Sequence, residues 1–496
     1  MGKGGIMKPF YDVIIIGTGV GGTAAGAILA REGNKVLFIE KNARIGGACS
    51  YYTREGVHVD IGAHMFSRGN RGPFGEVQRR LGATQLIRFM MCDPLMRFKG
   101  PQLDITERFR LHTVPRMYAS LFRQAGIHAK EIPSLLNYMA TPLVASDKRV
   151  DALNSQNMQD FLESYTQNPA IFLFMSIMTG LYFVIPFWWA SAGESLWCTK
   201  RAFRSLAPGY PKGGAVAVPR TFLDGARSFG AEVIENARVK HIRLQRGRAK
   251  GVETADGRFF ESRAVISTTS LQDTVKLTGR EHFPPSYRDH VQQIRGSMSA
   301  IQAKILLDRP VVQEGVLVGV RDRRPSQEAG FSGQDVRTMW EDTIEGRIPR
   351  LFSFYCPVPT NFDPELAPHG KQLLTITTAV QLSGHSAVDA QDKWIDAMLE
   401  ALFDIYPHIK NHIVWIDRFT NRFLDRWLGK RGGPVISTCQ HTGQVGRLRH
   451  PNHTPVPGLY VAGDCAGARG IGTELACQSG IECADTILQA MSNRIV

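Results

Sequence analysis

The chain has 496 residues, which is too long for one simple hydrophobic core and predicts two or three packed lobes. Hydrophobic residues make up 43% and charged residues 21%, values typical of a globular protein, so the composition excludes a disordered chain. The formal net charge of +14 favours contact with a polyanion, but no short run concentrates Lys and Arg as nucleic-acid-binding arms do. We therefore expect no nucleic-acid partner, and leave scattered surface charge and attraction to an anionic membrane as alternatives.

The cysteines and the N-terminus bear on metal binding and location. Eight cysteines are scattered along the chain, and none forms a C-x-x-C pair or another metal-ligand spacing. We therefore predict no metal site, and reduced thiols in a cytoplasmic protein, with peripheral attachment to a membrane left open. Residues 1–10 are Gly-rich and lack an apolar segment, which predicts no cleaved targeting signal.

Residues 11–40 predict a strand, a glycine turn, a helix and a second strand. Gly17, Gly19 and Gly22 form G-x-G-x-x-G directly after the strand, and Glu40 ends the next strand. In this motif the first glycine permits a tight turn, the second lets a pyrophosphate approach the helix N-terminus, and the third allows close packing. Glu40 is placed to accept hydrogen bonds from ribose hydroxyls, and its charge disfavours the 2′-phosphate of NADP.

A second glycine-rich segment follows Glu40. Gly46 and Gly47 form a doublet, and further on Gly62 and His64 end the stretch GVHVDIGAH. A second glycine loop directly after the acidic residue is not needed for NAD. It indicates a longer ligand whose far end returns past this loop.

The stretch from about residue 67 to 205 is irregular and apolar in blocks, and residues 169–189 carry no charge. This segment is long enough to span a bilayer, but Ser, Thr, Gly and Pro interrupt it and no second segment of that length exists. We expect a buried helix, or one that lines a substrate tunnel. A membrane-dipping surface, with Phe187, Trp188 and Trp189 as interfacial aromatics, is the alternative.

Residues 206–450 predict a helix at 220–229 and then short strands with a turn at Asp256-Gly257. Further strands at 300–307 and 371–380 predict a mixed sheet, and a helix is expected at 390–403. The chain ends with a strand that leads into Gly463-Asp464 and a helix from about Gly472. Asp464 is placed to bind polyol hydroxyls, and the helix N-terminus to stabilise negative charge on an electron-rich ring.

Together these residues resemble the phytoene desaturase and carotenoid isomerase group of FAD-dependent oxidoreductases. That group is part of a wider flavin superfamily that includes amine oxidases and retinol saturases. The resemblance rests on IIGTGVGG with Glu40, the glycine doublet, GVHVDIGAH, YPKGG at 210–214, NARVKHI at 236–242, FDPELAPHGK at 362–371, and TPVPGLYVAGDCAG at 454–467 with the glycine-rich helix start behind it.

The resemblance implies that FAD is the cofactor. Gly17, Gly19, Gly22 and Glu40 would hold its AMP half, Val239 would approach the adenine through its backbone, and Gly463 and Asp464 would hold the ribityl and pyrophosphate end. The other cofactor-binding positions are Gly46, Gly47, Gly62 and Gly472. One residue departs from the family, because Ala48 follows the glycine doublet where the family usually has Arg. Arg44 is the candidate replacement for that cation.

The predicted fold is α/β. A Rossmann-type FAD-binding domain is assembled from discontinuous segments, with a mixed-sheet substrate domain and a helical apolar subdomain. The FAD-binding parts are 1–66, 206–295 and 451–496, the helical apolar or membrane-facing subdomain is 67–205, and the substrate domain is 296–450.

Three functions remain open at this point. The first is an oxidoreductase or isomerase that acts on carbon–carbon bonds of an isoprenoid, carotenoid-like or lipid substrate, with hydride transfer at the flavin N5. Quinone, oxygen or a reduced carrier would be its redox partner. The second is a flavin amine oxidase, and the third is a non-catalytic prenyl or lipid escort protein on the same fold. His64 and Glu474 are the candidate catalytic residues, with a structural hydrogen bond as the alternative role for each.

Overall fold

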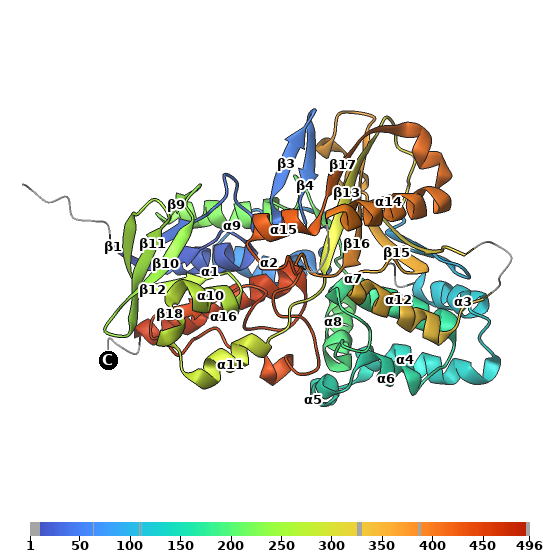
Figure 1. The fold of residues 1–496 in the computed structure, drawn as a ribbon, viewed down its shortest axis with the longest axis horizontal. Helices are drawn as coiled ribbons and strands as arrows, with labels where there is room; N and C mark the ends of the chain where they lie inside the picture. Colours follow the sequence, from blue (N-terminus) through green and yellow to red (C-terminus); the bar gives the residue numbers. More distant parts are fainter. Residues whose placement is uncertain are drawn as a thin grey trace, which may run out of the picture.

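The computed structural model describes residues 10–62, 64–108, 110, 112–324, 330–384 and 388–492. They form two lobes, one built on a sheet that draws on both ends of the described chain and one built on a second sheet above a layer of helices (Figure 1). Residues 1–9 lie outside this range, and with them most of the N-terminal segment expected to lack a targeting signal.

The first lobe contains a seven-stranded sheet whose strands come from distant parts of the chain. Val13, Ile14 and Ile15 in β1 are 0% exposed, because parallel strands on both sides and helices on both faces cover this apolar run. The strand order is β10-β11-β12-β1-β2-β9, and β18 pairs with the C-terminal residues of β12. The strands are β1 (Phe10–Ile16), β2 (Val36–Ile39), β9 (Glu232–Ile234), β10 (Val239–Gln245), β11 (Arg248–Thr254), β12 (Phe259–Ser267) and β18 (Leu459–Val461).

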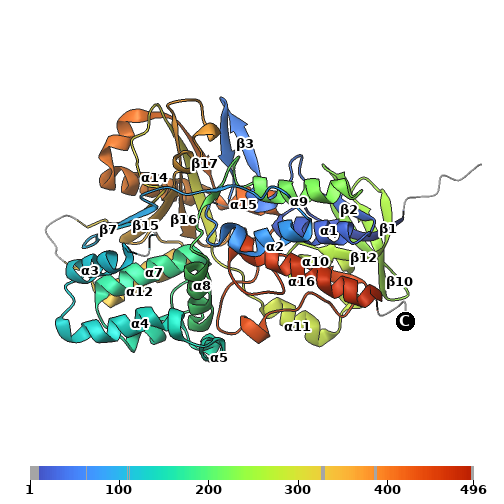
Figure 2. The same cartoon turned by 180° about the vertical axis from the view of Figure 1, so that it is seen from behind.

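Helices cover both faces of this sheet. α1, α2, α9 and α16 pack on one face and α10 and α11 on the other (Figures 1 and 2). α1 and α16 cross closely, because a Cβ on Gly480 would lie 2.3 Å from the Gly21 carbonyl oxygen. The helices are α1 (Val20–Arg31), α2 (Pro73–Arg80), α9 (Ala217–Ser228), α10 (Leu271–Thr278), α11 (Pro285–Gln293) and α16 (Gly472–Ser492). The predicted Rossmann-type lobe assembled from discontinuous segments is confirmed.

The second lobe contains a mixed sheet in the order β17-β13-β16-β15-β14-β6-β7. α14 (Val388–Ile405) packs on one face of it, as the apolar residues of the sheet and of this helix form one cluster. The strands are β6 (Met96–Lys99), β7 (Asp104–Glu107), β13 (Ser299–Leu307), β14 (Val316–Asp322), β15 (Leu351–Pro357), β16 (Gln372–Val380) and β17 (Ile413–Phe419). The strands and helix predicted between 300 and 403 are confirmed.

Helices from residues 114–205 and α12 cover the other face of the second sheet (Figures 1 and 2). They are α3 (Val114–Gln124), α4 (Ile132–Val144), α5 (Asp147–Ala152), α6 (Met158–Glu163), α7 (Pro169–Phe183), α8 (Ala192–Ser205) and α12 (Gly333–Glu345). Part of the range predicted as a helical subdomain, 67–205, supplies β6 and β7 to the sheet, since β6 pairs in parallel with β14. The division of the chain into five segments stays a prediction.

The first part of the charge-free segment 169–189 forms α7, which Asn168 caps at its N-terminus, and the C-cap residue Val184 has φ +52°. The helix is buried among its neighbours, and among the described residues no helix combines the length and the hydropathy that a bilayer crossing requires. Phe187 is 3% exposed, and Arg337 and Arg295 lie over the rings of Trp188 and Trp189. The alternative that placed these aromatics in a membrane interface is therefore wrong for Phe187.

Short elements join the two lobes. The hairpin of β3 and β4 stands between the sheets, and Asp60 at the end of β4 accepts hydrogen bonds from the Tyr210 hydroxyl and the Ala215 N–H. α15 leads from the second sheet back to the first lobe (Figure 1). These elements are β3 (Tyr51–Arg54), β4 (Val57–Asp60), β5 (Phe89–Met90), β8 (Tyr210–Pro211), α13 (Pro359–Phe362) and α15 (Asn421–Leu428).

Candidate active site

A cavity of about 890 Å³ lies between the two lobes, within the size range of small-molecule sites. One end is formed where β1, β2 and β18 finish, which is where open parallel sheets bind ligands. The other end lies against α7, α12 and β15 of the second lobe. The cavity therefore connects a dinucleotide-type site with a chamber between the sheet and the helical layer.

The glycine turn after β1 is open toward the cavity. Gly17 adopts φ +100°, a conformation that other residues rarely adopt, and Gly19 precedes α1 without a side-chain cap. A Cβ on Gly19 would meet no protein atom within 4 Å, so the N-terminus of α1 faces free space. Gly22 lies outside the cavity wall, and a Cβ there would lie 2.7 Å from the Gly17 carbonyl oxygen. The turn therefore fits a pyrophosphate at the helix N-terminus, with Gly22 serving close packing.

Glu40 forms the wall next to this turn and is 4% exposed. Its Oε2 accepts the Thr18 N–H at 3.0 Å and the Thr18 hydroxyl at 2.7 Å, and its Oε1 accepts the Asn42 N–H at 2.9 Å. These bonds hold the carboxylate in place. A carboxylate has about four acceptor positions, so Glu40 retains capacity for ribose hydroxyls.

The glycine doublet approaches the first turn closely. Gly46 and Gly47 have φ of +112° and +57°, and a Cβ on Gly47 would lie 3.2 Å from the Cα of Gly19. Ala48 lines the cavity beside them. Arg44, the predicted substitute cation, donates to the Tyr51 carbonyl oxygen at 3.1 Å and does not line the cavity. This arrangement gives no support to Arg44 as the replacement.

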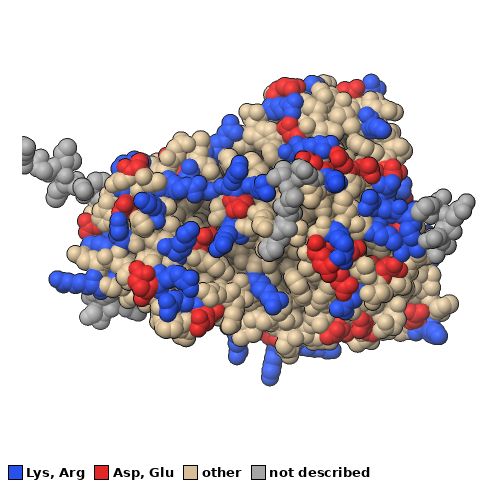
Figure 3. All heavy atoms as spheres, in the orientation of Figure 1, with Lys and Arg blue, Asp and Glu red and all other residues tan. Residues whose placement is uncertain are grey.

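Basic residues surround the part of the cavity nearest Val239 in β10. The cavity is lined there by Lys41, Arg238, Lys240 and Lys276, and Figure 3 shows Lys and Arg side chains around the hollow between the lobes. Burial and the nearby Arg238 lower the pKa of Lys41 to about 8. A positive potential at this end suits a ligand that carries phosphates.

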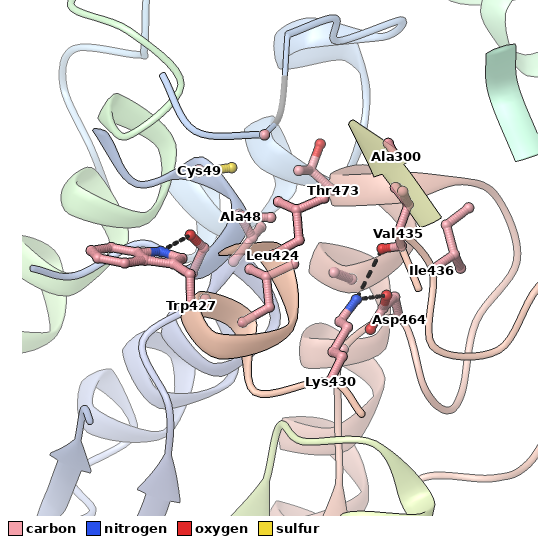
Figure 4. Close-up of a pocket in the computed structure, with 18 of the residues that line it drawn as sticks. Ala48, Cys49, Ala300, Leu424, Trp427, Lys430, Val435, Ile436, Asp464 and Thr473 are labelled. Carbon is pink, nitrogen blue, oxygen red and sulfur yellow. Dashed lines mark hydrogen bonds and ion pairs between the residues drawn. The ribbon is translucent and has the colours of Figure 1, made fainter. Parts of the chain in front are cut away.

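Asp464 follows Gly463, which has φ +110°, at the end of β18. Its Oδ2 accepts the Lys430 ammonium at 2.5 Å and the Ser437 N–H at 2.9 Å (Figure 4). Burial would raise the pKa of Asp464, but Lys430 and Ser437 outweigh it and hold the pKa below its usual 3.8. Asp464 is thus ionised at the cavity wall, with Oδ1 available to a hydroxyl.

α16 begins at Gly472 and directs its N-terminus toward the cavity, which Gly472 and Glu474 line. Glu474 is 7% exposed and its Oε1 accepts the Arg68 N–H at 2.7 Å. Burial raises the pKa of Glu474 above its usual 4.5, although Arg68 and hydrogen bonds from Ser67 oppose this. The carboxyl group therefore has a structural hydrogen bond, which is the alternative role expected for it.

His64 lines the cavity, and Gly62 lines it two residues before. Neither ring nitrogen of His64 has a hydrogen-bond partner among the described residues. Burial and the charge of Lys304 lower the pKa of His64 well below 6.5, so the ring is neutral at pH 7. Lys304 in β13 is 1% exposed and its ammonium also has no partner within the described part of the chain. His64 at the cavity wall and Lys304 outside it are thus two buried polar groups without a partner among the described residues.

The far end of the cavity is an apolar chamber. The side chains from α7, α12, β6 and β15 that line it within the described residues carry no charge. Trp340 in α12 closes the wall, since it donates to the Ser176 hydroxyl at 2.7 Å and packs against Gly180 of α7. The lining residues from these elements are Met96, Ile177, Met178, Gly180, Leu181, Tyr182, Trp340, Ser353, Phe354 and Tyr355.

The structure brings the predicted site residues, apart from Gly22, to this single cavity. The two glycine-rich ends, Glu40 and the ionised Asp464 fit FAD, whose phosphates would meet the N-terminus of α1. The sequence did not predict Lys430 in the wall or Lys304, which is buried outside it. Lys304 had a signal, a lone Lys in an apolar strand, whereas Lys430 follows α15 and has no local motif.

Comparison with protein families matches residues 20–488 to the family described as flavin containing amine oxidoreductase. Prolycopene isomerase of Daucus carota is 24% identical over 96% of this chain and 80% of its own length. An all-trans-retinol 13,14-reductase of Danio rerio is 22% identical over 97% of this chain and 87% of its own length. The zeta-carotene-forming phytoene desaturase of Myxococcus xanthus is 24% identical over 74% of this chain and 72% of its own length.

Solved structures share the fold. An oxidoreductase from Methanosarcina mazei superposes with a TM-score of 0.71 at 20% identity, and covers 97% of this chain and all of its own. A putrescine oxidase bound to putrescine superposes with a TM-score of 0.63 at 16% identity, and covers 98% of this chain and 99% of its own. At these identities the superpositions establish the fold alone.

Proposed function

The chain belongs to the flavin-containing amine oxidoreductase family, and from that premise we propose that it desaturates, saturates or isomerises carbon–carbon bonds of a bulky apolar substrate. It is an FAD-dependent oxidoreductase of the carotenoid and retinoid desaturase, isomerase and reductase type. The substrate we propose is isoprenoid, carotenoid-like or another lipid. The observation that carries this proposal is the uncharged chamber formed by α7, α12, β6 and β15 at the end of the cavity.

We assign the cofactor-binding roles as follows. The turn at Gly17 and Gly19 holds the pyrophosphate, Glu40 the ribose, the backbone of Val239 the adenine, and Asp464 the ribityl hydroxyls. Gly46, Gly47 and Gly62 line the cavity beside the pyrophosphate, and Gly463 and Gly472 line the opposite wall of the cavity. FAD supplies hydride transfer at its N5 when bound. The protein's own part is to orient the substrate, to exclude water and to move protons.

His64 is the stronger of the two candidates for proton movement. Its ring nitrogens have no partner among the described residues, whereas Glu474 already accepts the Arg68 N–H. Because burial keeps the imidazole neutral, one nitrogen can accept a proton while the other donates a hydrogen bond. We propose that Glu474 mainly fixes the loop at Arg68 next to the N-terminus of α16.

The test is an anaerobic titration of the holoenzyme with phytoene, prolycopene, retinol and putrescine, each added separately. Bleaching of the oxidised flavin by an isoprenoid would support dehydrogenation. Isomerised or saturated product after chemical reduction of the flavin would support the isomerase or reductase. Quinone or oxygen is then added to the reduced enzyme to find the acceptor. If no tested isoprenoid is converted, whether the flavin is oxidised or reduced, the proposal is contradicted.

Amine oxidation is the second candidate, because the family description points to it. The chamber argues against it. A protonated amine entering along α7 and α12 would meet no carboxylate there, among the residues described, and would lose its hydration without compensation. Bleaching by putrescine and by no isoprenoid would establish this second function.

We further propose that α4 brings the enzyme to a membrane, where an apolar substrate dissolves. Leu136, Leu143 and Val144 are 51%, 51% and 74% exposed, and helical spacing puts them on one face. Lys148 and Arg149, also exposed, lie in the first turn of α5, which begins at Asp147 directly after this face. An apolar stripe with flanking cations is typical of a helix that lies in the plane of an anionic bilayer.

A further inference from the structure

The phosphates of FAD need a positive charge that the glycine doublet does not supply. Ala48 follows the doublet and lines the cavity, and Arg44 donates to the Tyr51 carbonyl oxygen away from it. A helix N-terminus contributes only about half a charge. A pyrophosphate in a partly buried site therefore requires a cation from elsewhere in the chain.

α15 brings such a cation from the second lobe. Lys41 donates to the Arg426 carbonyl oxygen at 2.7 Å and Asn42 to the Trp427 carbonyl oxygen at 3.2 Å, so residues after β2 satisfy the C-terminal carbonyls of α15. The Trp427 indole donates to the Gly47 carbonyl oxygen at 3.3 Å (Figure 4). The end of α15 is thus fixed over the glycine doublet.

Lys430 follows α15 and its Gly429 cap, and points to the same part of the cavity. Its ammonium donates to Asp464 Oδ2 at 2.5 Å and to the Val435 carbonyl oxygen at 3.0 Å, and the side chain is 15% exposed (Figure 4). An ammonium has three donors, so one remains for a ligand.

The first turn of α1 lies next to this ion pair. A Cβ on Gly21 would lie 2.8 Å from the Cα of Gly463, the residue before Asp464. The other cations of the wall, Lys41, Arg238, Lys240 and Lys276, lie at the end of the cavity nearest Val239. The pKa of Lys41 is also lowered to about 8. Lys430 and the N-terminus of α1 therefore face the same section of the cavity.

We propose that Lys430 provides the positive charge for the FAD pyrophosphate, in the role left open by Ala48. The cofactor is then held from both lobes, by the α1 turn of one and by the segment that follows α15 of the other. This assignment concerns the cofactor alone and is independent of the substrate.

The experiment measures FAD affinity by titrating the deflavinated protein and following flavin fluorescence. Lys430→Met is expected to weaken FAD binding by about tenfold or more, the range for a lost hydrogen bond to a charged group. Lys393→Met, at an exposed lysine of α14, is the matched control and should leave the affinity unchanged. Equal affinity in Lys430→Met and wild type would overturn the proposal.

Ala48→Arg distinguishes a charge role from a purely structural one. Added to Lys430→Met it should restore the affinity to within about threefold of wild type, whereas loss of the Asp464 contact alone would not be recovered by a cation at position 48. Introduced into the wild type, Ala48→Arg should raise the FAD affinity by less than about threefold, because Lys430 already supplies the cation. A gain of tenfold or more in the wild type, or no recovery in the double variant, would show that Lys430 does not serve the phosphates. The wild-type arm holds even if Lys430→Met fails to fold.

Discussion

The two glycines at the start of α1 differ in what surrounds them, and this difference predicts two separate phenotypes. Gly19 faces free space and precedes the helix with φ −66°, which any residue adopts. Asn is among the residues preferred at this helix-capping position, so Gly19→Asn should leave the helix intact. We expect FAD affinity to fall about tenfold or more because the amide occupies the pyrophosphate position, while the melting temperature of the FAD-free protein stays within about 2 °C.

Gly22→Ala should do the reverse. Its Cβ would lie 2.7 Å from the Gly17 carbonyl oxygen and 3.1 Å from Ile15, which are parts of the packed core. We expect a loss of about 2 kcal/mol in the free energy of unfolding, as overpacked cores show. The melting temperature of the FAD-free protein measures it. A stable Gly22→Ala, or an unstable Gly19→Asn, would show that these assignments are wrong.

The buried ammonium of Lys304 should make the stability of the folded protein depend on pH. Burial lowers the pKa of Lys304 to about 7 in the folded protein, although Asp60 and Cys356 raise it, against 10.5 in the unfolded chain. Between pH 7 and 10.5 the unfolded state binds more protons, so this group makes stability rise with pH, and its full cost is present below pH 7. Lys304→Met should therefore stabilise the protein at pH 7 by a few kcal/mol, about 3–5, with the gain shrinking toward pH 10.

Melting temperatures of wild type and Lys304→Met at several pH values test this, with Lys393→Met as the control for a lost exposed lysine. An unchanged difference between wild type and Lys304→Met from pH 7 to 10 would mean that the ammonium is solvated or paired in the folded protein. A destabilised Lys304→Met at pH 7 would mean the same.

At the residue scale the sequence predicted the positions that a local motif defines. Gly17, Glu40 and Asp464 lie at strand ends, where position along the chain determines position in the fold. Lys430 lies 34 residues before its partner Asp464 and belongs to the other lobe, so no spacing rule connects them. Lys304 was visible as a charge in an apolar strand, but its lack of a partner depends on how the β3–β4 hairpin packs.

At the element scale, we expect the packing of α7 against α12 to determine the length of substrate that the cavity accepts. Trp340 lines both the main cavity and a neighbouring pocket of about 270 Å³, so its indole separates the two. Trp340→Leu should join them, and raise kcat/KM for a long isoprenoid relative to a short one by about fivefold, a modest change in fit. Competition between two chain lengths measures this ratio.

Ser176→Ala provides the control for that prediction. It removes the hydrogen bond to the Trp340 indole but leaves the ring between the two spaces. The ratio should then stay within about twofold of wild type, since a neutral hydrogen bond contributes only about 1 kcal/mol. An equal shift in both variants would assign the effect to mobility of the indole rather than to the opened wall.

Periodicity predicted the elements whose burial follows from their own sequence. The apolar run of β1 and the short strands β10–β12 appear where expected, and α7 forms within the charge-free segment. Two features could not be predicted this way. β6 joins the second sheet only through β14, more than 200 residues later in the chain, and α15 is fixed by carbonyl contacts with Lys41 and Asn42. Both depend on pairing between remote segments.

At the scale of the whole molecule the net charge of +14 has more than one use. Part of it lines the cofactor end of the cavity, where Lys41, Arg238, Lys240 and Lys276 gather. Exposed cations such as Lys148 and Arg149 lie instead beside the apolar face of α4. Under our proposals the first group attracts the phosphates of FAD and the second the headgroups of an anionic membrane.

The membrane role of α4 leads to a further prediction. Replacing Leu136, Leu143 and Val144 by Ser removes the apolar face and should reduce binding to vesicles of mixed neutral and anionic lipid by about tenfold or more. FAD affinity should not change, because these side chains do not line the cavity. The melting temperature should shift little, since the replaced side chains are at least half exposed.

Leu448→Ser provides the matched control, because Leu448 is 60% exposed and lies in the short 3-10 helix Gly446–Leu448 rather than on α4. Flotation of the holoenzyme with vesicles at low and high salt separates the two contributions. High salt should weaken vesicle binding by the wild type, because it screens Lys148 and Arg149. The residual vesicle binding of the triple Ser variant should then be near zero. If the triple variant floats as well as the wild type, α4 is not the docking surface. An enzyme that then still acts on isoprenoids must receive them from a soluble carrier rather than from a bilayer.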